Sequence, residues 1–327
     1  MEDACIDDNT ARFSQAESTL PMTEPLVTDL GYLADTEAAQ RILDGTYKIP
    51  ADLDPYAAKL IHELRMPESI RNSPFVPARV ETLDHTKGWA KQKETISADP
   101  DGLTFSHYKA GATDDLIAQF DATLRSLPYQ HGFTPAAWIP MTDVAILKKA
   151  GVYDVEKMRT ILLMNAEFNM NNKKLGREMM VNAELHGEIM REQYGSCRHH
   201  QCILAALNKR LTMDNLQQAR RSGALCANDA KSCYDRVVHN IATLAMRCMG
   251  VPANPIKSTL QKASHKIRTA FGVSNKTYGH GCDPPLQGFG QGNGCGPSGW
   301  AVISTPLINL VRTAGFGFFL LTALTVS

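Results

Sequence analysis

The segment 228–236 (NDAKSCYDR) carries the side chains in this chain that are best suited to catalysis. An apolar run before it predicts a strand over 224–229 that ends at Asp229, followed by a turn into an amphipathic helix. Carboxylates hold the Mg²⁺ ions that stabilise the attacking and leaving oxygens in phosphoryl transfer. Taken alone, the segment also fits a structural role, in which Asp229 caps the next helix and Asp235 pairs with Arg236 or a neighbouring lysine.

A second segment with chemical potential is the glycine-rich stretch 287–297 (QGFGQGNGCGP). Alternate glycines let a backbone approach a ligand closely. The stretch contains neither the GxxxxGK of a phosphate-binding loop nor the GxGxxG of a dinucleotide-binding turn, so both of these nucleotide sites are excluded. Taken alone, it also fits a flexible loop.

The two segments resemble motifs A and B of reverse transcriptases, particularly those of non-LTR retrotransposons. Motif A of that family has an Asp, an aromatic residue five positions later and often a second Asp at six. Motif B has Gln-Gly, with a Pro six residues after the Gln. The matching positions are Asp229, Tyr234 and Asp235 for motif A, and Gln291, Gly292 and Pro297 for motif B.

Four further segments resemble parts of the same family and occur in the family's order. They are the Pro-Asp-Gly turn at 100–103, a fingers strand at 143–149, the fingers segment at 159–165 and the Gln-x-Gly segment at 193–195. Each is a weak signal by itself. Six segments in one order, over residues 95–305, identify the chain as similar to the fingers and palm of a reverse transcriptase.

The resemblance implies a role for each matching residue. Asp229 would be a catalytic ligand of Mg²⁺, and Asp235 would be structural. Tyr234 would lie under the incoming sugar and favour deoxynucleotides. Arg159 and Lys148 or Lys149 would contact the triphosphate, for which paired guanidinium donors are suited.

The resemblance also implies residues that contact the template and primer. Gln291 and Gly292 would line the pocket for the nucleotide and the template base. Basic side chains would contact phosphates largely without sequence preference, although a solvated surface explains them equally well. These are Lys173, Lys174, Lys262, Lys266 and Arg268.

The chain departs from the family pattern most seriously at motif C, which normally supplies two adjacent Asp residues. After Asp283 the sequence contains no Asp or Glu. The family uses three carboxylates where this chain has one, so we expect the chain to be inactive alone. The smaller departures are Gly296 in place of Ser and Thr160 in place of Pro.

The apolar tail at 313–327 is too short for a membrane span. It fits an interfacial helix, a core helix or a tail produced by a frameshift or early stop, and we favour the last. The start of the chain is acidic and does not resemble a signal peptide. We therefore expect an intracellular protein, in the cytoplasm or nucleus, with no membrane association and no predicted protein partner.

Charge is distributed unevenly along the chain. Residues 1–140 carry 22 Asp or Glu and 12 Lys or Arg, a net of −10, and the remaining residues carry the opposite balance, a net of +10. A basic half indicates an anionic partner such as nucleic acid, or a solvated surface that the acidic half balances. The Cys and His residues at 197–202 lack zinc spacing and are expected to be reduced thiols and surface histidines.

Strand and helix patterns are mixed without regular alternation, which predicts an α+β fold. The elements imply a partial right-hand polymerase, with fingers and part of the palm but no thumb. We expect a partly disordered acidic region with short helices at 1–94, the incomplete polymerase-like unit at 95–312 and the tail at 313–327. Within the first region, residues 1–30 are expected to be loosely attached and 66–101 to form a linker.

The expected elements follow from apolar periodicity and from capping residues. Helices are predicted over 35–43, 55–64, 113–127, 165–190, 199–211, 237–249, 256–265 and 297–310; strands over 143–149, 159–164 and 224–229; and a hairpin over 266–278. Two functions remain open. The first is a retroelement reverse transcriptase unit whose parent enzyme copies an RNA template from a DNA primer with dNTPs. The second is a non-enzymatic remnant that binds nucleic acid weakly.

Overall fold

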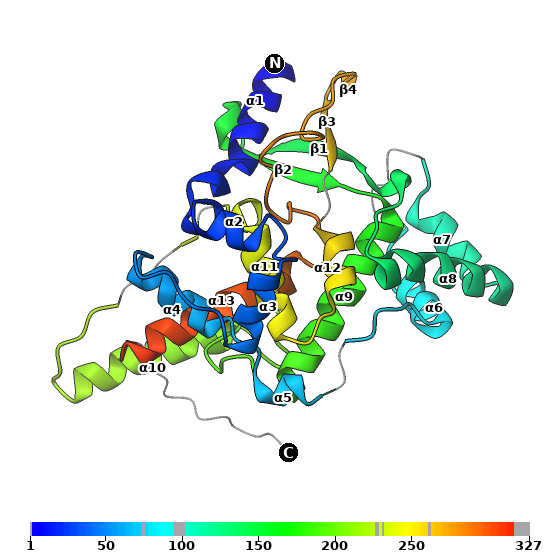
Figure 1. Cartoon of the computed structure of the whole chain (residues 1–327). Coiled ribbons are helices and arrows are strands. Elements are labelled where there is room, and N and C mark those ends of the chain that lie inside the picture. The colour runs from blue at the N-terminus through cyan, green and yellow to red at the C-terminus, as the bar shows by residue number, and fades with distance from the viewer. Residues whose placement is uncertain are drawn as a thin grey trace.

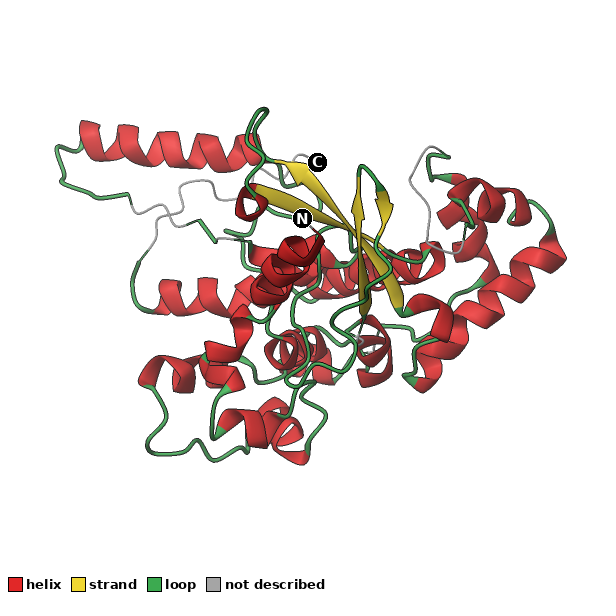
Figure 2. Cartoon of the chain, turned by 90° about the horizontal axis from the view of Figure 1, so that it is seen from above, coloured by secondary structure: helices red, strands yellow, loops and turns green. Residues whose placement is uncertain are grey.

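The computed structural model describes residues 2–73, 76–94, 102–225, 229–230, 232–260 and 263–316 (Figure 1). Helices predominate, and one small sheet lies against them (Figure 2). The helices are α1 (Glu2–Phe13), α2 (Leu26–Leu30), α3 (Glu37–Asp44), α4 (Pro55–Glu63), α5 (Glu68–Arg71), α6 (Thr82–Ala90), α7 (Phe105–Gly111), α8 (Asp115–His131), α9 (Ala166–Leu185), α10 (Cys202–Gln218), α11 (His239–Cys248), α12 (Ala253–Thr259) and α13 (Gly296–Thr313).

The sheet has four strands, in the order β2-β1-β3-β4. These are β1 (Pro140–Leu147), β2 (Met158–Leu163), β3 (Ser264–Thr269) and β4 (Gly272–Val273). Strands β1 and β2 form an antiparallel hairpin, whereas β3 pairs with β1 in parallel from a distant part of the sequence. The mixed sheet and the surrounding helices confirm the predicted α+β class.

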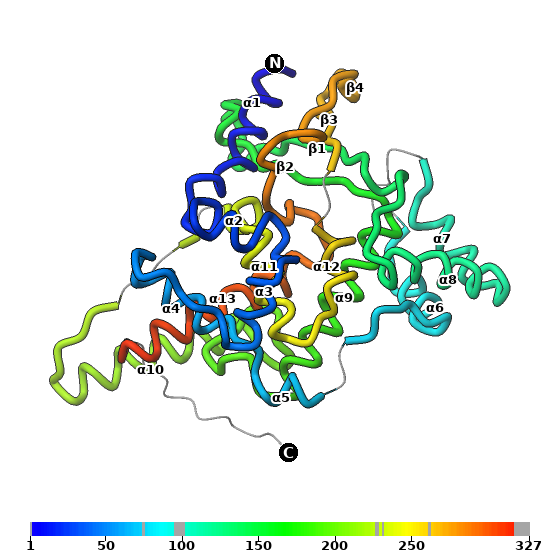
Figure 3. The backbone as a smooth tube through the Cα atoms, viewed as in Figure 1, coloured from blue at the N-terminus to red at the C-terminus, as the bar shows by residue number. Residues whose placement is uncertain are grey.

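Helix α11 forms the centre of the largest hydrophobic core. All of its residues except Arg247 are buried, and α3, α12 and α13 pack around it (Figure 3). Helix α9 approaches α13 closely at Gly176, where an added Cβ would collide with the Ser298 hydroxyl. The glycine therefore allows the two helices to pack together, because any side chain would force them apart.

Capping residues explain why several of the predicted helices begin and end as they do. The side chain of Thr36 accepts a hydrogen bond from the backbone of Ala39 at the start of α3, and Gly45 ends this helix with a φ of +73°. Asp114 and Asn165 cap α8 and α9 in the same way. Each satisfies backbone donors that a helix leaves free in its first turn.

The first thirty residues are packed against the rest of the protein, contrary to the expected loose attachment. Leu26 and Leu30 are 2% and 0% exposed. The buried side chain of Asn240 on α11 donates to the carbonyl oxygens of Pro21 (2.8 Å) and Gly31 (3.1 Å). Apolar periodicity in the sequence does not reveal how residues 2–30 are attached, because the attachment depends on such polar contacts.

Three other segments also differ from their predictions. The expected linker over 66–101 contains α5 and α6, and Trp89 of α6 is fully buried. The expected helix over 256–265 ends at Thr259, and the residues from Ser264 onward pair with β1 as β3. The chain turns between Thr269 and Gly272, whereas the hairpin predicted over 266–278 has its turn at Ser274 and Asn275. Half of the predicted strand at 224–229 (residues 226–228) and the tail from 317 lie outside the described residues, and residues 224, 225 and 229 are not in a strand.

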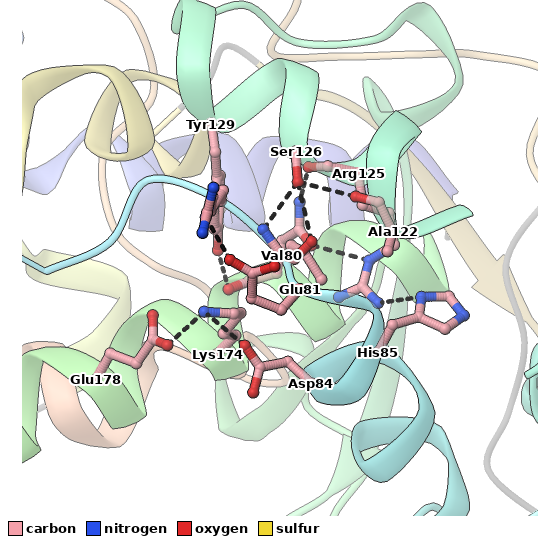
Figure 4. A network of polar contacts seen from close by, with 12 residues as sticks. Val80, Glu81, Asp84, His85, Ala122, Arg125, Ser126, Tyr129, Lys174 and Glu178 are labelled. Carbon is pink, nitrogen blue, oxygen red and sulfur yellow. Dashed lines mark hydrogen bonds and ion pairs between the residues drawn. The ribbon is translucent and has the colours of Figure 1, made fainter. Parts of the chain in front are cut away.

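A buried polar cluster joins α6, α8 and α9 (Figure 4). The guanidinium of Arg125 donates from Nε to Oδ1 of Asn171 (2.9 Å) and lies 3.0 Å from Nδ1 of His85. Burial, together with the charge of Arg125, lowers the pKa of His85 to about 4. His85 is therefore neutral at physiological pH, and its ring can accept from the guanidinium.

Candidate functional site

The glycine-rich segment 287–296 runs between strand β2 and the 3-10 helix η5 (Cys233–Arg236). The backbone N–H of Leu162 donates to the carbonyl oxygen of Gln291 (2.6 Å), and that of Phe289 donates to Tyr234 (2.8 Å). Three segments that are distant in sequence are thereby held together. They are the segments that resemble the fingers segment at 159–165, motif A and motif B.

Two glycines of this segment are required by the close approach of the backbones. Gly288 has a φ of +98°, and a Cβ there would lie 2.8 Å from the carbonyl oxygen of Asp235. Gly292 has a φ of +124°, and a Cβ there would overlap the carbonyl oxygen of Leu162. Only glycine adopts such backbone angles without strain and leaves this space free.

The start of α13 is joined to two other predicted motif segments. A Cβ on Gly296 would lie 3.7 Å from the ring of Tyr234, so motifs A and B are in side-chain contact distance. Further along α13, the hydroxyl of Ser304 accepts a hydrogen bond from Nε2 of Gln193 (2.8 Å), in the Gln-x-Gly segment. Because β1 also pairs with β2, the structure brings together five of the six segments that the sequence singled out, all except the turn at 100–103.

A pocket lies between the turn after β1 and the turn before η5. It is lined by Lys148 and Ser232, and by Asp8 and Arg12 of helix α1. Lys148 and Lys149 are exposed, as side chains that bind a triphosphate must be. Helix α1 therefore covers the side of the site on which Lys148 lies.

Arg159 lies on the other face of the sheet, away from this pocket. Its neighbour Thr160 is buried beneath α1, where its hydroxyl accepts from Nη1 of Arg12 (3.0 Å). Because successive residues of a strand point to opposite faces, Arg159 points away from α1. The structure thus separates two residues, Arg159 and Lys148, that the sequence assigned to one ligand.

The face that carries Arg159 also carries two of the predicted nucleic-acid contacts. Ile146 pairs with Arg159, and Val144 pairs with Arg268; Lys266 lies two residues from Arg268 on β3. Residues that lie opposite each other in neighbouring strands point to the same side. We call the face that carries Arg159, Lys266 and Arg268 the basic sheet face.

The basic sheet face is accessible and free of acidic residues. Arg159 and Arg268 are exposed, and Lys266 is half-buried. None of the positions that β1, β2 and β3 contribute to this face is Asp or Glu. The three cations therefore have no carboxylate within their own face, which favours binding to a polyanion.

The remaining predicted nucleic-acid contacts lie elsewhere. Lys173 donates to Oε1 of Gln92 (3.1 Å). Lys174 is 11% exposed and forms ion pairs with Asp84 (3.5 Å) and Glu178 (Figure 4). Because the charge of Lys174 is already balanced within the protein, Lys174 is a weaker candidate than Arg159 for a contact with nucleic acid. Lys262 lies outside the described residues.

A buried polar network lies between helix α1 and the sheet. Asp143 is fully buried, accepts a hydrogen bond from the hydroxyl of Tyr278 and lies 3.2 Å from Nδ1 of His265. Asn9 of α1 donates to the same tyrosine hydroxyl (3.1 Å) and accepts from Thr160 (2.9 Å). Neither Asn9 nor His265 was predicted to be part of the site, because polar residues at single positions give no periodic signal.

Asp235 has a buried side chain without hydrogen-bond partners. It is 1% exposed, and neither carboxylate oxygen has a hydrogen-bond partner among the described residues. Burial raises the pKa of Asp235 to about 6, although the charge of Arg12 opposes the shift. An unpaired carboxylate in such a position is costly when ionised.

Replacing Asp235 with Asn should change how stability depends on pH. The native state holds the Asp235 proton more tightly than the unfolded chain, so stability should fall as pH rises from about 4 to about 6. Asp235→Asn should remove this fall and stabilise the protein at pH 8 by up to about 3 kcal/mol. Urea unfolding between pH 4 and 8 measures both quantities. Identical pH profiles for the two proteins would show that the carboxylate is not destabilised by burial.

Asp229, the predicted catalytic residue, is exposed at the edge of a gap in the described chain. Residues 226–228 and 231 lie outside the described residues. Among those described, no group of three or more His, Cys, Asp or Glu side chains is arranged to hold a metal ion. Asp229, the carboxylate of the predicted Mg²⁺ site, lies among the described residues, but parts of the chain on both sides of it in the sequence do not.

No protein-family model matches the chain, and no curated protein is found to be similar to it. In the part of the chain that the structure describes, no helix has the length and apolar character to cross a membrane.

Proposed function

We propose that this chain is a reverse-transcriptase-like unit, comprising fingers and part of a palm, that binds nucleic acid through the basic sheet face. The parent activity would be RNA-templated DNA synthesis from a DNA primer with dNTPs and Mg²⁺. The observation that carries the proposal is the convergence of Arg159, Lys266 and Arg268 on one accessible face without acidic residues. The contact between Tyr234 and the start of α13 gives further support.

Nucleic-acid binding should depend on the basic sheet face and on salt. Removing all three cations (Arg159→Gln, Lys266→Gln and Arg268→Gln) should weaken binding of a labelled RNA–DNA duplex at least tenfold at about 0.1 M salt. Each lost phosphate contact should also lower the slope of log affinity against log salt by about 0.9. Fluorescence anisotropy of the full chain across a salt series measures affinity and slope together.

A matched control separates these contacts from the effect of net charge. Arg41, Lys59 and Arg79 are exposed on the acidic part of the chain, and replacing all three with Gln removes the same charge. The control variant should keep nearly the affinity and slope of the unmodified chain. Equal weakening in both triple variants would mean that overall charge, and not the basic sheet face, accounts for binding.

The 327-residue chain should not incorporate dNTPs on a primed RNA template. Two-metal phosphoryl transfer needs more than one carboxylate near the primer end, and the sequence after Asp283 supplies none. A primer-extension assay with Mg²⁺ and radiolabelled dNTPs tests this expectation. Incorporation that disappears in Asp229→Ala would show that the chain is an active polymerase.

A further inference from the structure

Helix α8 presents a continuous apolar stripe to solvent. Leu116, Phe120, Leu124 and Leu127 follow one another at helical spacing and are 77%, 62%, 45% and 38% exposed. The opposite side of α8 is packed on the protein through small or polar residues such as Ala118, Ala122 and Ser126. A stripe of large apolar side chains over three turns marks a protein interaction surface more often than a solvated one.

Acidic residues border the stripe, and no lysine or arginine lies on the exposed side of α8, which ends at the exposed His131. Asp114 and Asp115 lie at its start and Asp121 near its middle, while its one arginine, Arg125, is buried. Two α8 helices paired symmetrically about the middle of the stripe would place the two copies of Asp121 near one another. The surface therefore fits a partner that is both apolar and basic.

Helix α10 of the same chain has this chemistry. It is also 17 residues long, and none of its residues is buried. Ile203, Leu207 and Met213 are 66%, 43% and 44% exposed and fall within about one third of the helix circumference. Arg210 lies within this arc and forms an ion pair with Asp214 (3.1 Å), the one acidic residue of the helix, so Lys209, beside the arc, supplies the unbalanced positive charge.

The two helices of one molecule cannot meet, because they lie at opposite ends of it (Figure 1). We propose that α8 of one copy binds α10 of a second copy, which produces a head-to-tail assembly. Both helices are about 25 Å long, so their apolar stripes match in length. Such a heterologous contact leaves one α8 and one α10 free at the ends, so assembly continues beyond the dimer unless a ring closes.

Complementary variants test the head-to-tail geometry directly. The α8 variant carries Leu116→Glu and Phe120→Glu, and the α10 variant carries Ile203→Glu and Arg210→Glu. All four side chains are exposed, so circular dichroism and a thermal melt should confirm an intact fold. Sedimentation velocity at low salt, over a range of protein concentrations, should show association of the unmodified chain that increases with concentration.

Each variant alone should remain at the monomer mass of 35.9 kDa. An equimolar mixture should form a dimer and nothing larger, because only one intact α8 and one intact α10 then remain to pair. Phe271→Glu, at an exposed hairpin tip, should associate as the unmodified chain does.

Three results would overturn the proposal. The first is an equimolar mixture of the two variants that stays monomeric. The second is an α8 variant that no longer associates beside an α10 variant that still does, which would indicate α8–α8 pairing or another partner. The third is an unmodified chain that stays monomeric at about 100 μM, well above the dissociation constants of specific assemblies. The outcome is independent of nucleic-acid binding, so it does not test the proposed function.

Discussion

Replacing Gly292 with Ala should lower the free energy of unfolding by about 4 kcal/mol, at the upper end of single-residue effects. The added Cβ would overlap the carbonyl oxygen of Leu162, and the φ of +124° would strain any residue with a side chain. Neither group can move alone, because Leu162 also donates its N–H to Gln291. Urea unfolding followed by circular dichroism measures the change.

Gly272 provides a matched control for this prediction. Its φ of +129° is nearly the same, but nothing lies within 4 Å of the position of its Cβ. Gly272→Ala should therefore cost only the backbone strain, about 1–2 kcal/mol. If the two variants lose equal stability, the glycine-rich segment does not approach β2 as closely as the structure indicates.

Replacing Arg125 with Ala should cost about 4 kcal/mol. The change leaves a cavity at the junction of α6, α8 and α9, and it removes the partner of Asn171 and of His85 (Figure 4). The guanidinium also lies 5.7 Å from the ring centre of Trp89, a cation–π contact that would be lost. Chemical denaturation of the purified variant measures the loss.

Two further substitutions separate the causes of this loss. Arg125→Met fills most of the volume without the hydrogen bonds and should cost about half as much as Arg125→Ala. Arg79→Ala removes an exposed arginine that pairs with Glu81 and should change stability by less than about 1 kcal/mol. A Met variant as stable as the unmodified chain would mean that the buried charge contributes no net stability.

Helices with strong local signals could be predicted from the sequence. Thr36 and Gly45 bound α3, and Asn165 begins α9, because a cap and a glycine act through their immediate neighbours. The attachment of α1 could not be predicted, since Asn9 and Arg12 hold it through polar contacts with residues far along the chain. The turn between β3 and β4 was missed because the pairing of β3 with β1 determines where the strand lies.

The sequence motifs singled out candidate residues but not their arrangement. Tyr234 lies near the start of α13, which comes just after Gln291 and Gly292, the residues that the resemblance assigned to the nucleotide pocket. Arg159 and Lys148 were expected to share a ligand, whereas strand alternation places Arg159 on the other face with Arg268. That grouping depends on the parallel register of β1 and β3, which no local pattern encodes.

Photo-cross-linking tests the nucleic-acid interface most directly. The full chain would be irradiated with a primer–template duplex whose RNA strand contains 4-thiouridine, and the cross-linked peptides would be identified by mass spectrometry. The basic sheet face predicts saturable cross-links to peptides from 158–163 and 264–269, reduced when Arg159, Lys266 and Arg268 are replaced. Saturable cross-links confined to residues 2–94, or none in either strand of the sheet, would contradict the account.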